Sequence, residues 1–151
     1  MKPQLRAATP ADAAISQVII QSLRQSNALD YSPDIIARVE KGFSIESVRA
    51  LLSQRQVFIA TIDDQVVATA SLDRDVVRSV FVDSAHQRCG LGQQLMAMIE
   101  SLATEAKIEV LRVPASITAE AFYFKLGFRK VRDEFHGAER TIIMERRLPA
   151  L

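Results

Sequence analysis

Two glycines, Gly90 and Gly92, open what the sequence predicts to be a long helix directly after a strand. The first N–H groups of a helix lack intrahelical partners, and the helix dipole places partial positive charge at the same end. The glycines let a ligand approach this backbone without meeting a Cβ, and Arg88 adds a formal charge. The segment Gln87-Arg88-Cys89-Gly90-Leu91-Gly92 therefore predicts an anion site, although a lone Gly-x-Gly pattern also occurs in ordinary tight turns.

Two common phosphate-binding motifs are excluded for this segment. A Walker loop needs Gly-Lys-Ser/Thr, and none follows here. The dinucleotide fingerprint has a third glycine where this chain has Leu95. His86 and Cys89 stand close together, but no third group that would orient them is recognisable, so a Cys–His hydrolase is disfavoured.

A second feature is the strand expected at residues 108–113, which ends in Val113-Pro114. Proline has no N–H to donate and is poorly tolerated within a central strand, so we expect the strand to end there. If two parallel strands separate at their C-terminal ends, their unpaired backbone groups can bind a ligand. Simple termination of the strand by Pro114 is the plainer interpretation when this feature is taken alone.

The helices and strands that must position this turn can be predicted from the spacing of apolar residues, which differs between helices and strands. Residues 5–8 predict a strand, and Thr9, Pro10 and Asp12 together predict a helix start. Further helices are expected after Ser32-Pro33, ending near Gly42, and after Ser44. The other expected elements are strands at 57–62, 66–72 and 76–82 around a hairpin at Asp63-Asp64-Gln65, a helix at 91–106, a strand at 108–113, a helix at 116–125, and strands at 128–132 and 141–145.

The resulting order is β-α-α-α-β-β-β-α-β-α-β-β. Hairpins are antiparallel, whereas the two strands that flank the long helix should be parallel and joined by a right-handed crossover. We therefore expect a mixed α/β sheet, in one domain that spans residues 1–151.

The composition of the 151 residues narrows the function classes. With 48% apolar and 25% charged residues, the chain is not disordered. A net charge of +1 disfavours a dedicated nucleic-acid-binding protein. One cysteine cannot form an internal disulfide, no metal-ligand spacing is present, and no membrane span or signal peptide is recognisable, so we expect a cytoplasmic protein without a metal.

Two motifs together resemble the GNAT superfamily of acyl-CoA-dependent N-acetyltransferases. The first is a strand followed by Gln/Arg-x-x-Gly-x-Gly/Ala, here residues 87–92. The second is a small polar residue, an alanine and Phe-Tyr-x-x-x-Gly-Phe, here Ser116, Ala119 and residues 122–128. Asp30-Tyr31-Ser32-Pro33 and residues 115–119 are similar to a small bacterial group whose amine acceptors are mostly unassigned. That group often has an aromatic residue near Val39.

The resemblance implies acetyl-CoA as the cosubstrate. Its pantetheine arm would pair with the backbone of Val80, Phe81 and Val82, and its pyrophosphate would accept N–H bonds from residues 88–93. The residues expected at the acetyl-CoA site are Val80, Phe81, Val82, Gln87, Arg88, Cys89, Gly90, Leu91, Gly92, Gln93 and Ser116. Ser116 would also be the N-cap of the short helix.

The resemblance also makes Tyr123 the candidate general acid, because a phenol that is neutral at pH 7 can protonate a departing thiolate. Phe122 and Phe128 are interpreted as core residues. Tyr31 either lines the acceptor pocket or packs. The general base is not identifiable: the candidates are Asp75, His86, Glu120, His136 and a chain of water molecules.

Two function classes stay open on the sequence alone. The first is an enzyme that acetylates a primary amine of a small molecule or a protein by direct attack in a ternary complex. The second is a catalytically silent acyl-CoA-binding or regulatory module on the same fold. Neither a nucleic acid nor a membrane is expected as a partner, and a homodimer is compatible with the sequence.

Overall fold

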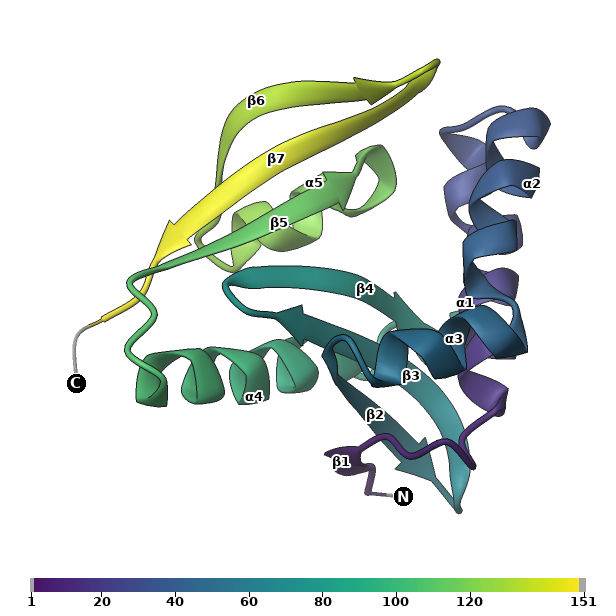
Figure 1. Ribbon diagram of the computed structural model, residues 1–151, viewed down its shortest axis with the longest axis horizontal. Coiled ribbons are helices and arrows are strands. Elements are labelled where there is room, and N and C mark those ends of the chain that lie inside the picture. The colour runs from purple at the N-terminus through teal and green to yellow at the C-terminus, as the bar shows by residue number, and fades with distance from the viewer. Residues whose placement is uncertain (1, 150–151) are drawn as a thin grey trace.

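A single mixed sheet organises the chain, of which the computed structural model describes residues 2–149. Its seven strands lie in the order β1-β2-β3-β4-β5-β7-β6 (Figure 1). Within this range only β4 and β5 are parallel, and every other pair is antiparallel. The predicted fold class and element order are confirmed. The strands are β1 Gln4–Ala7, β2 Gln56–Ile62, β3 Gln65–Asp73, β4 Val76–Val82, β5 Val110–Ser116, β6 Arg129–His136 and β7 Glu139–Arg147.

Helices cover both faces of the sheet (Figure 1). On one face α4 buries Leu95 and Ile99 in the same core as Val77 of β4. On the other face α1 buries Ile15 beside Ile59 of β2. The helices are α1 Ala14–Gln25, α2 Pro33–Glu40, α3 Ile45–Leu52, α4 Leu91–Glu105 and α5 Glu120–Lys125, with short 3-10 turns at Asn27–Leu29, Lys41–Phe43, Ser84–His86 and Ile117–Ala119.

A β-bulge in β4 separates that strand from β5. The β3–β4 register jumps from the pair Ser71–Arg78 to the pair Thr69–Phe81, so two β4 residues stand opposite one residue of β3. One of the two is Ser79, whose φ is +54°. A bulge bends its strand, and β4 pairs with β5 only at Val76–Arg112. Beyond that point the two strands diverge toward their C-terminal ends (Figure 1).

Pro114 lies inside β5, so the prediction that the strand ends at this residue is wrong. It is opposite Ile143 of β7, and the strand continues to Ser116. The N–H of Arg112 donates to Asp75 O on the β4 side at 2.9 Å. Because strand residues alternate, the nitrogen of Pro114 faces that side too. Pro114 therefore cannot donate the next bond of the parallel ladder, and the pairing of β4 with β5 ends at Val76–Arg112.

The first helix starts later than the sequence predicts. It begins at Ala14, and Thr9 is not its N-cap. The carboxylate of Asp12 instead accepts the Thr9 N–H at 2.7 Å and two bonds from the Arg6 guanidinium of β1. This ion pair between residues six apart holds residues 9–12 in a turn. The caps predicted at Ser32 and Ser44 are confirmed, since their hydroxyls accept the N–H groups of Ile35 and Ser47.

None of the helices within residues 2–149 combines the length and apolar character needed to cross a bilayer. In the same range no three His, Cys, Asp or Glu side chains are grouped so that they could hold a metal ion.

The Arg6–Asp12 pair gives a titration test of this corrected helix start. The Arg6 hydrogen bond lowers the Asp12 pKa from 3.8 to about 2. The pair therefore stabilises the fold fully above the unfolded pKa of 3.8, and this contribution disappears as the pH falls through about 2. We expect Arg6→Gln to move the Asp12 pKa back toward 3.8 in a carboxyl NMR titration. Arg24→Gln, which breaks an ion pair elsewhere, is the control; an unchanged Asp12 pKa in Arg6→Gln contradicts the role given to Arg6.

Candidate active site

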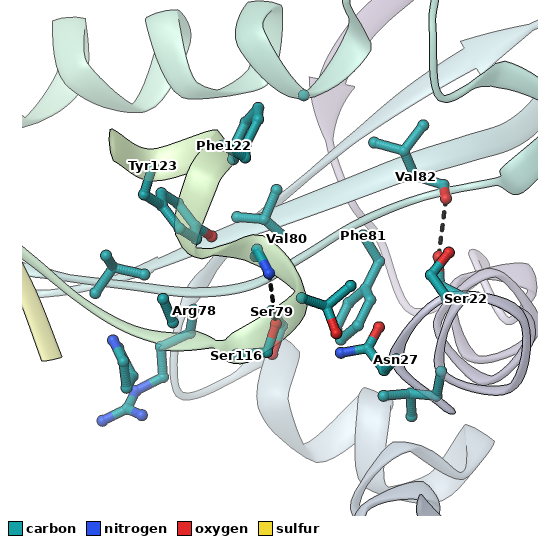
Figure 2. Close-up of a pocket in the computed structure, with 18 of the residues that line it drawn as sticks. Ser22, Asn27, Arg78, Ser79, Val80, Phe81, Val82, Ser116, Phe122 and Tyr123 are labelled. Carbon is teal, nitrogen blue, oxygen red and sulfur yellow. Dashed lines mark hydrogen bonds between the residues drawn. The ribbon is translucent and has the colours of Figure 1, made fainter. Parts of the chain in front are cut away.

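A cleft of about 780 Å³ opens where β4 and β5 diverge. Its walls come from β4, β5, the turn before α4, the helix α5 and the segment between α1 and α2 (Figure 2). Most of the site residues expected from the sequence line this cleft. They are Val80, Phe81 and Val82, the turn residues Gln87, Arg88, Gly90, Gly92 and Gln93, and also Ser116, Tyr123 and Tyr31. Cys89 and Leu91, which the sequence also assigned to the cosubstrate site, are absent from this lining.

The turn before α4 leaves backbone donors free. Gly90 is the N-cap and has a φ of +74°, a left-handed conformation that favours glycine. The first residue to bond back is Gln94, whose N–H reaches Gly90 O at 3.1 Å. The N–H groups of Leu91, Gly92 and Gln93 therefore lack intrahelical partners. With Arg88 and Lys125 both lining the cleft, this end is suited to an anion.

The backbone donor of Cys89 is already used within the turn. The Cys89 N–H donates to His86 O at 3.2 Å, and the residue is exposed. Gln87 instead fixes the turn to the end of α1, because its side-chain amide donates to Ser26 Oγ at 3.0 Å. Gln87 still lines the cleft, whereas Cys89 does not.

The three β4 residues differ in how their backbone faces the cleft. Phe81 is paired with Thr69 of β3, and the Asp83 N–H donates to Val67 O of the same strand at 2.8 Å. Since strand residues alternate, Val82 points its backbone away from β3, toward the gap. Its carbonyl accepts the Ser22 hydroxyl at 2.8 Å (Figure 2), which leaves the N–H for a ligand.

Tyr123 is buried, yet its hydroxyl reaches the cleft. The ring packs edge-to-face against Phe122 and Phe128, with centroids 5.1 and 5.6 Å away. Within residues 2–149 the hydroxyl has no hydrogen-bond partner, although no fully enclosed side-chain polar atom there is left unpaired. The oxygen must therefore have access to the cleft, and it points toward β4 near Val80 (Figure 2). Burial raises the pKa of Tyr123 above its ordinary value, so the phenol stays neutral.

Ser116 and Tyr31 both have structural partners. The Ser116 hydroxyl accepts the Ala119 N–H at 3.1 Å, which confirms it as a cap. The Tyr31 hydroxyl accepts the Ile117 N–H at 2.8 Å and donates to Arg140 O at 2.7 Å. Tyr31 therefore lines the cleft and also joins the segment after α1 to β7. Its hydroxyl already accepts one hydrogen bond and donates another, so only its ring is available to contact an amine substrate.

Of the four candidate bases, His136 alone lies on the cleft lining within the described residues. Asp75 is held by Arg112, with Oδ2 3.2 Å from Nη1. His86 Nδ1 is 3.2 Å from the Asp83 carboxylate. Glu120, in the first turn of α5, does not line the cleft.

Several polar residues of the cleft were not predicted from the sequence: Asn27, Arg55, Arg78, Ser79 and Glu139. None belongs to a motif. Arg78 and Ser79 are neighbours in β4, and the other three come from separate parts of the chain that only the fold brings together. One signal was available in β4, where a charged residue, Arg78, interrupts a run of apolar residues between Val76 and Val82.

The two glycines of the turn have different roles, and Gly92 gives a stability test. A Cβ on Gly92 would lie 3.1 Å from two ring atoms of Phe122, so this glycine is required by packing between α4 and α5. We expect Gly92→Val to lower the free energy of unfolding by about 1–3 kcal/mol in chemical denaturation. Phe122→Leu should recover part of that loss by making room.

Gly42→Val is the matched control for this test, because a Cβ there meets nothing within 4 Å. Equal losses at Gly42 and Gly92, or no recovery with Phe122→Leu, contradict the packing role.

Comparisons with known proteins agree on one family. Residues 27–144 match the family described as "Acetyltransferase (GNAT) domain". The Escherichia coli (strain K12) protein named "Uncharacterized N-acetyltransferase YafP" is 27% identical over 135 residues, which cover 87% of this chain and 84% of YafP.

Solved structures show the same fold. A GCN5-related N-acetyltransferase from Rhodopseudomonas palustris superimposes with a TM-score of 0.92 at 26% identity, covering 98% of this chain and 97% of that one. The PaiA N-acetyltransferase from Thermoplasma acidophilum, solved in complex with coenzyme A, has a TM-score of 0.83 at 17% identity, covering 97% and 99%. The described architecture and the family match together establish that this chain belongs to the GNAT acetyltransferase family.

Proposed function

We propose that the protein transfers an acetyl group from acetyl-CoA to a primary amine, by direct attack within a ternary complex. The observation that carries the proposal is that the cleft joins two features. At one end are the free N–H groups of Leu91–Gln93, and on its wall is the hydroxyl of Tyr123, which has no hydrogen-bond partner among residues 2–149. A silent CoA-binding module would need the first feature and would have no use for the second.

The residues present are suited to acetyl-CoA as a substrate. The pyrophosphate would accept bonds from the N–H groups that open α4, with Arg88 and Lys125 adding charge. The pantetheine amides would pair with the unpaired edge of β4, where Val80 has no partner on β3 and Val82 keeps a free N–H. The coenzyme A in the PaiA structure supports this assignment by fold analogy.

The chemistry then needs one bond formed and one broken. The neutral amine nitrogen attacks the thioester carbonyl carbon, and the carbon–sulfur bond breaks as the amide forms. An N–H of β4 at Val80 or Val82 would donate to the oxyanion of the tetrahedral intermediate. The amine nitrogen loses one proton, to His136 or to water. The sulfur gains one from Tyr123, which recovers its proton from solvent.

Burial prepares Tyr123 for this role. Because burial raises its pKa, the hydroxyl carries its proton at physiological pH and can donate as negative charge develops on sulfur. The same burial makes a free tyrosinate unfavourable, so the residue must be reprotonated in the same turnover. Its placement by Phe122 and Phe128 limits rotation of the ring.

Tyr123→Phe tests the proposal because it removes the hydroxyl and keeps the ring packing. We expect the Kd for acetyl-CoA to change little, since the bond to sulfur matters mainly in the transition state. The kcat should fall by about 10²–10⁴-fold, the usual contribution of general acid catalysis. The loss should shrink with an acyl donor whose thiol leaves as a stable anion, and thiol release measures both cases.

A weaker acetyl-CoA affinity with unchanged kcat would make Tyr123 a binding residue and contradict this mechanism. If no amine releases thiol from acetyl-CoA although coenzyme A binds, the silent-module alternative replaces the enzyme.

A further inference from the structure

Two arginines lie together in the cleft on the other side of the β4 bulge from α4. Arg78 is in the first half of β4, whereas the free N–H groups of α4 follow the end of that strand. Arg55 comes from the turn before β2, and its guanidinium donates to the bulge residue Ser79 at 3.1 Å. Both side chains are half-buried and line the cleft.

This arginine pair lacks a full complement of counter-charge. Within residues 2–149 no carboxylate comes within 4.0 Å of Arg55, and only Asp73 does so for Arg78. That contact, 3.9 Å between Nε and Oδ2, is too long for a hydrogen bond. Burial, and then repulsion by Arg78, lower the pKa of Arg55, as expected where like charges approach out of water.

The other charged residues of the cleft already have roles. Glu139 is paired with Arg38 at 3.0 Å. Arg88 and Lys125 lie by the opening turn of α4 and by α5, where the pyrophosphate is proposed to bind. Arg55 and Arg78 are thus the positive charges of the lining without an assigned role. Asp73 offsets only part of their charge, because its carboxylate is shared between Arg78 and the exposed Arg74, at 3.9 and 3.7 Å. The pair therefore keeps an excess of positive charge at the cleft.

We propose that the amine acceptor carries a carboxylate, which binds between Arg55 and Arg78 while its amine meets the acetyl group. This inference rests on the proposed acetyl transfer. A guanidinium binds a carboxylate through two parallel hydrogen bonds, and the excess positive charge of the pair favours an anionic group there.

The position of the pair limits the size of the acceptor. Arg78 stands two residues before Val80 in β4, with the bulge residue Ser79 between them, and both line the same cleft. If Val80 lies beside the acetyl group, the carboxylate and the reacting nitrogen occupy neighbouring parts of that cleft. The acceptor class is therefore a small amino carboxylic acid, such as an amino acid, and not a long polyamine.

The experiment measures thiol release from acetyl-CoA with matched amines: amino acids, their uncharged primary amides, phosphorylated amino alcohols of similar length, and polyamines. We expect the acids to exceed their amides in kcat/KM by about 10–100-fold. Arg78→Gln should remove this preference through a rise in KM, with unchanged affinity for coenzyme A, and Arg78→Lys should restore part of it. Arg55→Lys keeps a positive charge near Ser79. It therefore distinguishes a role of Arg55 in supporting the bulge from a role in binding the carboxylate of the acceptor.

Arg74→Gln is the matched control, since Arg74 also approaches Asp73 but is exposed and lies outside the cleft lining. It should keep the wild-type preference. Equal rates for acids and amides, a preference for polyamines, or a preference for phosphorylated amines each overturns the carboxylate assignment while leaving acetyl transfer intact. Absence of thiol release with every amine instead contradicts the proposed function on which the inference rests.

Discussion

The bulge at Ser79 is the feature on which the rest of the site depends. A sheet of this kind would normally pair β4 with β5 along their whole length, and no ligand could enter. The parallel ladder ends after a single pair, Val76–Arg112, where Pro114 has no N–H to donate, and the bulge then bends β4 so that the strands stay apart toward the start of α4. One local irregularity thereby exposes strand backbone and helix N–H groups to the same cleft.

Packing and charge then give the two ends of the cleft different properties. Toward α4, free N–H groups and two basic side chains favour the phosphates of a nucleotide. Near the bulge, a second pair of positive charges is held half-buried, and Arg55 bonds to Ser79 itself. Tyr123 reaches the cleft between these two regions on the short helix α5. A substrate that enters from one end can therefore meet a second, smaller substrate from the other.

Features set by bonds within one helical turn could be predicted from the sequence. Features set by contacts between different elements could not. Ser32 and Ser44 act as caps because their hydroxyls bond within one turn of chain, which a sequence records directly. Asp12 could not be interpreted correctly, because its partner Arg6 lies on a strand. The motif turn and Tyr123 were recognisable by resemblance. The arginine pair was not, because Arg55 and Arg78 come from different elements and are brought together only in the folded chain.

The most direct test of cosubstrate binding in this cleft is an amide NMR titration of the protein with coenzyme A. If the cosubstrate binds in the gap between β4 and β5, the largest shifts should be those of Val80, Val82 and Leu91–Gln93, because their N–H groups are the free donors. Amides of β1, on the far edge of the sheet, should not move. Binding that shifts other regions and leaves the start of α4 unchanged would contradict a cosubstrate site between the two strands.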